Sequence, residues 1–301
     1  MQFQFSLAPL LSLVVALFVV AFAMRTRARV IRNFERAFAV RRPVGAHGVV
    51  IGAEPVYLRG SDSHAVLLIH GFGDTPQSVR PLADALNAAG WTVNAVLLPG
   101  HGRSLREYAA ARAPDWIAHA RSSYRELRAT HQTVVVCGIS MGAALSTILA
   151  AEHSEIRAVA LLAPYFVMQR NMQIKSLLAR LLEFVIPYHA NTGGDRSIHD
   201  AAARARTVGT GVVTGGSLLA LRDIATRAQH ALPFMNARVL YLQSREDNRL
   251  SETDAVAQFA RVGSAVKEQR WLTGCGHIIT VDYCRDEVAR QVVAWFAPEM
   301  G

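Results

Sequence analysis

Cysteine and charge are both scarce in this sequence of 301 residues. Its three cysteines, Cys137, Cys275 and Cys284, match no metal-binding spacing and no disulfide framework. Only 18% of the residues are charged and 51% are hydrophobic, which suffices for one large core. The sequence contains no pattern typical of a phosphate-cradling loop or of a metal-ligand cluster. We therefore expect neither a metal nor an organic cofactor.

The positive charge is concentrated near the N-terminus. The formal net charge is +9, and residues 25–42, with seven arginines and one acid, carry +6 of it. A nucleic-acid-binding face needs its basic residues on the folded body. We therefore expect no nucleic-acid partner, despite a sequence pI of about 10.1.

Phe5 to Met24 is a run of twenty residues without a charged side chain. As a helix it would span about 30 Å, the thickness of a bilayer core. We expect a single-pass membrane anchor over residues 1–24 and a basic juxtamembrane linker over residues 25–46. The arginines after the anchor favour a cytoplasmic folded domain. The alternative is a signal peptide cleaved near Ala21 to Ala23, with secretion of the remainder.

Buried strands alternate with amphipathic helices in the rest of the chain. This alternation predicts βαβ units in an α/β fold with a mostly parallel, doubly wound sheet. Two short apolar segments, 49–51 and 56–58, predict a β-hairpin at the start of the domain. The expected strands cover residues 64–70, 92–98, 133–139, 158–163, 238–244 and 268–273.

An insertion over residues 165–233 interrupts this alternation, so the core is expected over 47–164 and 234–301. The insertion has no strand pattern, and we expect an all-helical cap. An apolar stripe from Ile174 to Val185 recurs at helical spacing. Such a stripe can pack on the body, line a pocket or face a bilayer. Packing is the commonest of the three.

The segment from Thr133 to Gly142, T-V-V-V-C-G-I-S-M-G, carries the clearest chemical signal. A buried strand leads into a turn with Ser140 between two glycines, and a helix follows. This arrangement is typical of a nucleophile elbow. The glycines are expected because Ser140 must take a strained backbone conformation and side chains beside it would collide.

A serine nucleophile needs an adjacent base. His277 follows the last predicted strand in a glycine-containing turn, and we expect it to be the base. His70 and His101 also lie beside glycines, but in turns where a structural role is the simpler interpretation. The other histidines have no comparable setting.

The acid that orients the base should follow a strand end between Ser140 and His277. Asp247 lies three residues after the strand that ends at Ser244, and Glu246 is its close alternative. Asp254 is expected to cap a helix or to lie on its surface. The order serine, aspartate, histidine is that of the α/β-hydrolases.

An ester-cleaving serine also needs backbone N–H donors for the oxyanion of the tetrahedral intermediate. Met141, at the start of the helix after Ser140, is one expected donor. Phe72, in the turn His70-Gly71-Phe72-Gly73, is the other.

The chain resembles α/β-hydrolases of the monoacylglycerol lipase and bacterial carboxylesterase group. The similarity covers roughly Val49 to Pro298 and implies the same roles for Ser140, Asp247, His277, Phe72 and Met141. The anchor and the long insertion depart from the usual members. The motifs that carry the resemblance are H-G-F-G-D-T-P (70–76), L-P-G-H-G-R-S (98–104), G-I-S-M-G (138–142), Q-S-R-E-D (243–247) and G-H-I-I-T-V-D-Y-C-R-D (276–286).

The function expected from these features is that of a membrane-anchored serine carboxylic-ester hydrolase. It would act on a small, lipid-like ester, such as a monoacylglycerol, through an acyl-enzyme. A thioesterase or an amide-cleaving serine hydrolase is the alternative, because both share this chemistry. A non-catalytic scaffold is a third hypothesis, which the complete set of catalytic residue types opposes.

Overall fold

The computed structural model describes residues 8–191 and 194–300. Its main sheet has seven strands in the order β1-β3-β2-β4-β5-β8-β9, and every neighbouring pair is parallel except β1 with β3. This confirms the expected α/β sheet. The strands are β1 (Val56–Leu58), β2 (His64–Ile69), β3 (Thr92–Val96), β4 (Thr133–Ile139), β5 (Ala158–Leu162), β8 (Arg238–Ser244) and β9 (Lys267–Leu272).

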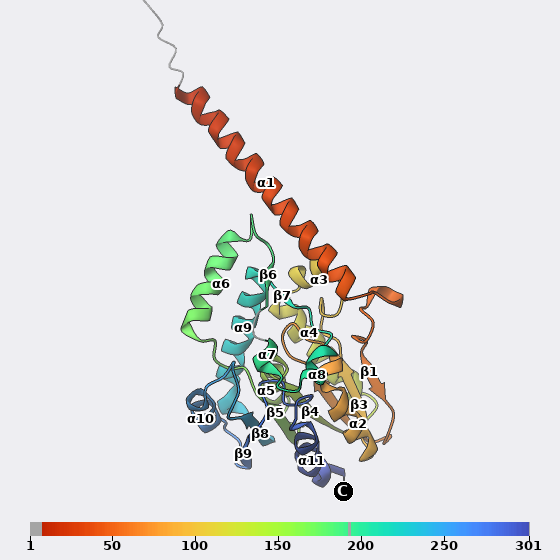
Figure 1. Cartoon of the computed structure of the whole chain (residues 1–301). Coiled ribbons are helices and arrows are strands. Elements are labelled where there is room, and N and C mark those ends of the chain that lie inside the picture. The colour runs from red at the N-terminus through yellow and green to blue at the C-terminus, as the bar shows by residue number, and fades with distance from the viewer. Residues whose placement is uncertain (1–7, 192–193, 301) are drawn as a thin grey trace, which may run out of the picture.

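Helices cover both faces of the sheet (Figure 1). On one face lie α2 (Arg80–Ala88) and α11 (Arg285–Phe296), and on the other lie α4 (Ala113–Arg128), α5 (Met141–Glu152) and α9 (Gly215–Ala231). Side chains of β2 alternate between the two cores, because successive residues of a strand point to opposite faces. The shorter elements of the body are α3 (Leu105–Ala110), α10 (Glu252–Ala260) and the 3₁₀ turns Ala46–Gly48, Pro76–Val79, Leu232–Phe234 and Ala297–Met300.

The turn between β4 and α5 depends on two glycines. Ser140 has a φ of 55°, in the left-handed region that most residues avoid. A Cβ at Gly142 would lie 2.1 Å from the carbonyl oxygen of Ile69, and a Cβ at Gly138 would lie 2.3 Å from that of Gly142. The predicted steric need for both glycines is confirmed. At Gly142 the colliding atom belongs to the neighbouring strand β2.

The predicted opening hairpin is wrong. Residues Val56–Leu58 pair with β3, and Val50 makes only an isolated bridge to Val44. Val49 and Val50 instead pack beside Phe38 of the N-terminal helix. Val49 and Val50 therefore pack against the N-terminal helix and do not form a strand of a hairpin. A short apolar run in the sequence does not distinguish these two kinds of packing.

The cap consists of α6 (Arg170–Leu182), β6 (His189–Ala190), α7 (Gly194–Ser197), α8 (Ala201–Ala205), β7 (Val212–Val213) and α9. β6 and β7 form an antiparallel pair, so the expectation of an all-helical cap is wrong in this detail. Strands of two residues are too short to leave a periodic pattern in the sequence. The N-cap residue of α9 is Thr214, whose hydroxyl accepts a hydrogen bond from the Ser217 amide.

The N-terminal helix α1 (Ala8–Arg41) is unbroken and projects away from the body (Figure 1). In the described chain it is the one helix that is long and apolar enough to cross a membrane, and its apolar stretch is exposed. Residues 25–41, expected to form a linker, continue this helix onto the body. Phe38 is buried there, and the ring of Phe34 lies 5.9 Å from that of Tyr188. The first residues of the expected anchor, 1–7, lie outside the described ranges.

Cys275 and Cys284 form a disulfide, with their Cα atoms 5.9 Å apart. The expectation of no disulfide is therefore wrong for this pair. The two cysteines are nine residues apart in sequence, and only the fold of the segment between them brings their side chains together. Cys137 is a buried free thiol within β4, as expected for a small apolar residue.

We predict that Gly142→Ala lowers the free energy of unfolding by about 3 kcal/mol or more, because its methyl group would collide with backbone that cannot move easily. Gly194→Ala is the matched control, since no atom lies within 4 Å of its added Cβ. Denaturant unfolding of both variants measures the difference. Equal stability of the two variants would contradict the packing described for the elbow.

Candidate active site

Three side chains from distant parts of the chain meet at the carboxyl ends of the parallel strands. His277 Nε2 lies 2.9 Å from Ser140 Oγ, and His277 Nδ1 lies 2.7 Å from Asp247 Oδ2. Ser140 follows β4, Asp247 follows β8 and His277 follows β9. The structure thus brings together the three residues predicted as nucleophile, acid and base.

The two alternative acids lie elsewhere. Glu246 accepts a hydrogen bond from the Gly274 amide at 2.6 Å, which holds the turn before the disulfide. Asp254 lies in the first turn of α10, where its carboxylate accepts from the hydroxyl of the cap residue Ser251. Asp247 is therefore the acid that contacts His277.

The carboxylate of Asp247 is fully buried and surrounded by donors. Its oxygens accept from the amides of Arg249 and Leu250 and from Gln243 Nε2, at 2.7 to 3.1 Å. Burial alone would raise the pKa of Asp247, but His277 and the two amides together lower it below its ordinary value. An ionised Asp247 assigns the proton to Nδ1 of His277 and leaves the Nε2 lone pair facing Ser140.

The turn after β2 lies directly against Ser140. A Cβ at Gly71 would be 3.4 Å from the Ser140 Cβ, which places this turn within van der Waals distance of the serine. In the described chain, no hydrogen bond uses the Phe72 amide. Met141 opens α5, and the first N–H groups of a helix have no partner within it. Both predicted oxyanion donors are thus adjacent to the serine.

His70 and His101 hold this turn in place. Nε2 of His101 accepts from the Gly73 amide, and Nε2 of His70 accepts from the Leu98 amide, both at 3.1 Å. Burial lowers the pKa of His101 to about 4 and that of His70 well below its usual range. Both rings therefore stay neutral and can accept these bonds, in agreement with the predicted structural role.

Asp282 is a site residue that the sequence analysis did not single out. It is buried, and its carboxylate accepts from four amides at 2.7 to 2.9 Å. Two of these amides belong to cap residues His199 and Asp200, and a third belongs to Gly276, next to His277. Asp282 therefore joins the cap to the histidine turn. Its position in the motif 276–286 could have marked Asp282 as important. Its role could not be predicted, because its partners are backbone amides, which every residue except proline carries.

Asp74 is a third buried carboxylate, close to the oxyanion turn. Its Oδ1 accepts from the Thr75 amide at 2.9 Å. Burial raises the pKa of Asp74 to about 6, against the lowering effects of Ser78, Thr75 and His277. The cap lies over this turn as well, because the Thr210 amide donates to the carbonyl oxygen of Gly73 at 2.7 Å.

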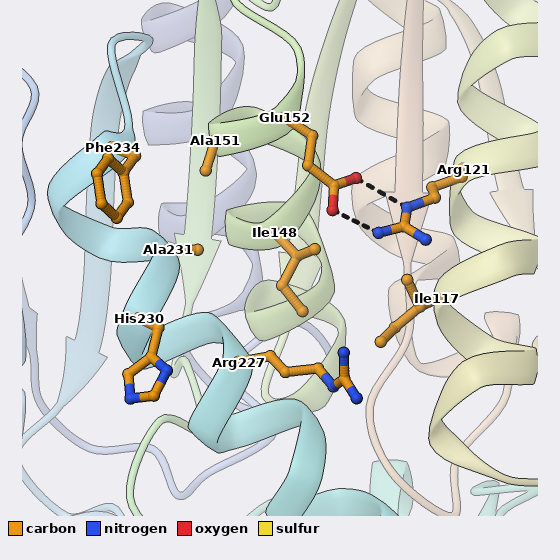
Figure 2. Close-up of a pocket in the computed structure, with 9 residues that line it drawn as sticks. All are labelled: Ile117, Arg121, Ile148, Ala151, Glu152, Arg227, His230, Ala231 and Phe234. Atoms are coloured by element: carbon orange, nitrogen blue, oxygen red, sulfur yellow. Dashed lines mark hydrogen bonds and ion pairs between the residues drawn. The ribbon is translucent and has the colours of Figure 1, made fainter.

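A separate hollow of about 270 Å³ lies between α4, α5 and α9 (Figure 2). Ile117, Ile148 and Phe234 line it, and the ion pair between Arg121 and Glu152 lies beside them. Glu152 ends α5 whereas Ser140 precedes its first residue, and twelve helical residues span about 18 Å. This hollow is therefore remote from the serine. Within residues 8–191 and 194–300, no group of three potential metal-ligating side chains occurs.

Comparison with known proteins gives one family match and several relatives. The family described as Hydrolase_4, serine aminopeptidase S33, matches residues 60–283. A thermostable monoacylglycerol lipase from Bacillus sp. (strain H-257) is 29% identical over 84% of this chain and 98% of the lipase. A carboxylesterase from Bacillus subtilis (strain 168) is 24% identical over 81% of this chain and 96% of the esterase.

The fold is also shared with solved structures. A solved structure from the description of LipS and LipT, two metagenome-derived lipolytic enzymes, matches this chain with a TM-score of 0.75 and 28% identity. The match covers 82% of this chain and 98% of that chain. The similarity therefore extends over nearly the whole of each relative.

We predict that replacing Asp74 and replacing Asp282 by asparagine change the free energy of unfolding in opposite directions above about pH 6. The pKa of Asp74 is raised, so its ionisation opposes folding, and Asp74→Asn should raise the free energy of unfolding at pH 7 by about 1–3 kcal/mol. This gain should be complete above about pH 6 and vanish near pH 4, the ordinary aspartate pKa.

The pKa of Asp282 is lowered: burial would raise it, but the four amides prevail. Asp282→Asn should therefore destabilise the fold above about pH 4, by about 2–3 kcal/mol, and this loss should shrink as the pH falls further. Urea unfolding of both variants from pH 3.5 to 8 measures the two trends. Parallel curves for the two variants would contradict the assigned charge states.

Proposed function

The chain belongs to the Hydrolase_4 family, serine aminopeptidase S33, and from this premise we propose a membrane-attached carboxylic-ester hydrolase with Ser140 as nucleophile. The resemblance to monoacylglycerol lipases and carboxylesterases, predicted from the motifs, is confirmed by these relatives. The chain is an ester-hydrolysing enzyme with the α/β-hydrolase fold. The details of its site, substrate and membrane attachment are our proposal.

The observation that supports the site is the continuous hydrogen-bonded series from Asp247 through His277 to Ser140. As Ser140 Oγ attacks the ester carbonyl, His277 Nε2 takes its proton, and Asp247 stabilises the resulting imidazolium. The amides of Phe72 and Met141 would donate to the oxyanion. His277 then protonates the leaving alcohol, and an acyl-enzyme remains on Ser140.

Water completes the cycle by the same groups. His277 removes a proton from water as its oxygen attacks the acyl carbon, and the second tetrahedral intermediate collapses to release the acid. Every proton that moves passes through Nε2, so no metal or organic cofactor is needed in this scheme.

We infer a lipid-like ester as substrate, of the monoacylglycerol or medium-chain type. The named lipase and carboxylesterase relatives support this class. Thioester or amide cleavage is the alternative, because either would pass through the same acyl-enzyme. Purified enzyme assayed on an ester, a thioester and an amide with one common acyl chain discriminates between these activities.

We infer that the apolar half of α1 anchors the enzyme in a membrane and that residues 47–164 with 234–301 form the catalytic core beneath a cap, residues 165–233. The arginines that follow the apolar half favour a body on the cytoplasmic side. In a reducing cytoplasm Cys275 and Cys284 would be held as thiols, whereas their disulfide would persist in a secreted protein. The thiol state therefore distinguishes the anchor from the signal-peptide alternative.

We predict that Ser140→Ala lowers kcat for p-nitrophenyl ester hydrolysis about 10³-fold or more, because the substitution removes the oxygen that His277 activates. Asp247→Asn should lower kcat about 10²–10⁴-fold, since His277 would lose the acceptor that fixes its tautomer.

Glu246→Gln is the matched control, one residue away and without contact to His277. It should leave kcat nearly unchanged, because the amide oxygen can still accept from Gly274. Full activity of the Ser140 variant, or equal losses at positions 246 and 247, would contradict the proposed roles.

We predict that Cys275 and Cys284 are reduced in intact cells. Acid trapping followed by maleimide-polyethylene glycol labelling in denaturant should add three labels per chain, one of them at Cys137. Labelling of Cys137 alone would show an oxidised pair and would place the body outside the cytoplasm.

A further inference from the structure

One face of the cap helix α6 is apolar and exposed. Five leucine or isoleucine side chains on this helix, and a phenylalanine just after it, are 49% to 76% exposed. They recur at helical spacing, so they form one surface, here called the α6 face. Its members are Ile174, Leu177, Leu178, Leu181, Leu182 and Phe184.

The opposite side of α6 is fixed against the body. Ser176 is buried, and a Cβ at Gly215 of α9 would lie 2.5 Å from the Arg180 Cα. So close an approach of two helix backbones leaves α6 no room to rotate about its axis. The α6 face is therefore held outward, and the predicted packing on the body applies only to the other side of the helix.

The end of α6 is joined to α1 near the end of the apolar stretch of that helix. Nη1 of Arg27 donates to the carbonyl oxygens of Glu183 and Phe184, at 2.7 and 3.1 Å. Arg27 follows Met24, the last residue of the uncharged run, by three residues, which is about 4.5 Å along a helix. Phe184 and the end of α6 thus lie at the depth where α1 would leave the hydrocarbon.

The charges around this surface fit an anionic membrane. α1 carries Arg25, Arg29 and Arg32 just beyond its uncharged run, and α6 carries an exposed Lys175. Arg180 of α6 is also exposed, and it forms an ion pair with Glu183 at 3.1 Å. Figure 1 shows α6 on the side of the body toward which α1 projects. Basic side chains flanking an apolar helix face are typical of helices that lie in the headgroup region of a bilayer.

We propose that the α6 face is a second membrane contact, which lies in the interface of the same bilayer that α1 crosses, in a leaflet with anionic lipids. This inference rests on the proposed membrane attachment. A bilayer is favoured over a protein partner because the α6 face continues the apolar surface of α1 and the arginines border both. The cap over Ser140 is then in contact with the phase in which a lipid-like ester dissolves.

The test is depth-dependent quenching in the full-length enzyme. Leu181→Cys is labelled with an NBD maleimide in the folded protein, in which Cys137, Cys275 and Cys284 are all buried. The protein is reconstituted in vesicles of phosphatidylcholine and phosphatidylglycerol at 3:1, with or without a doxyl lipid. We expect the doxyl lipid to quench this label at least about twofold.

Two labelled controls separate this inference from the proposed membrane attachment. Val256→Cys on α10 is 52% exposed, matched to the α6 face, and should not be quenched. Leu17→Cys, in the apolar half of α1, should be quenched. Quenching at position 17 but not at 181 would overturn the α6 contact alone, whereas no quenching at either position would overturn the attachment as well.

A kinetic measurement gives an independent readout. The double variant Leu177→Glu with Leu181→Glu should raise KM for vesicle-embedded monoacylglycerol by about tenfold, because two charges would enter the interface. Its kcat/KM for a water-soluble short-chain ester should be unchanged, since neither residue belongs to the site. An equal fall in kcat/KM for both substrates would contradict the proposal and indicate that these residues stabilise the fold of the cap.

Discussion

The close approach of α5 to the end of β2 is the constraint on which the site depends. With no side chain at Gly142, the first turn of the helix lies against the carbonyl oxygens of Ile69 and His70. This contact places the strained Ser140 beside the turn that begins at Gly71. The serine, the start of a helix dipole and the two candidate oxyanion amides are therefore positioned by one packing contact between backbones. A larger residue at 142 would separate all of them at once.

The histidine turn is positioned differently, by buried charge. Asp247 approaches His277 from one strand end, and Asp282 holds the Gly276 amide together with two amides of the cap. Each carboxylate is buried among hydrogen-bond donors that keep it ionised. Removing either the carboxylate or a donor would leave a buried polar group without a partner and would lower the stability of the fold. The cap is consequently part of the framework of the site, because its backbone completes the shell around Asp282.

The sheet and the site residues could be predicted because their signals are local or repeated. β4, β5 and β8 each contain an uninterrupted apolar run, and the elbow is a five-residue pattern with a steric reason for each glycine. Asp247 was preferred to Glu246 from its distance after the strand and from the resemblance, and the structure places it against His277. The catalytic roles themselves stay predictions until the variants are assayed.

The features that were missed are those that depend on contacts between distant segments. The two-residue strands β6 and β7 have no period, and the partners of Asp282 are amides that every sequence possesses. The Cys275–Cys284 bond requires a chain path that spacing alone does not specify. The arginine-rich stretch 25–41 looks solvated in sequence, but every few residues it presents a side chain, such as Phe34 or Phe38, to the body.

That continuous helix has a mechanical consequence. A flexible linker of seventeen residues would have a root-mean-square end-to-end distance of roughly 20–25 Å. A domain on such a linker could change its position and orientation freely. Residues 25–41 of α1 form instead a continuous helix that contacts the rest of the protein through Arg27 and Phe38, and Arg42, the next residue, donates to the Gly209 carbonyl oxygen. With α1 in a membrane, as proposed, this rigid helix would keep the body from turning away to bind substrate in solution. The body would present one fixed side to the membrane, and its substrate would reach the cap by lateral diffusion in the bilayer.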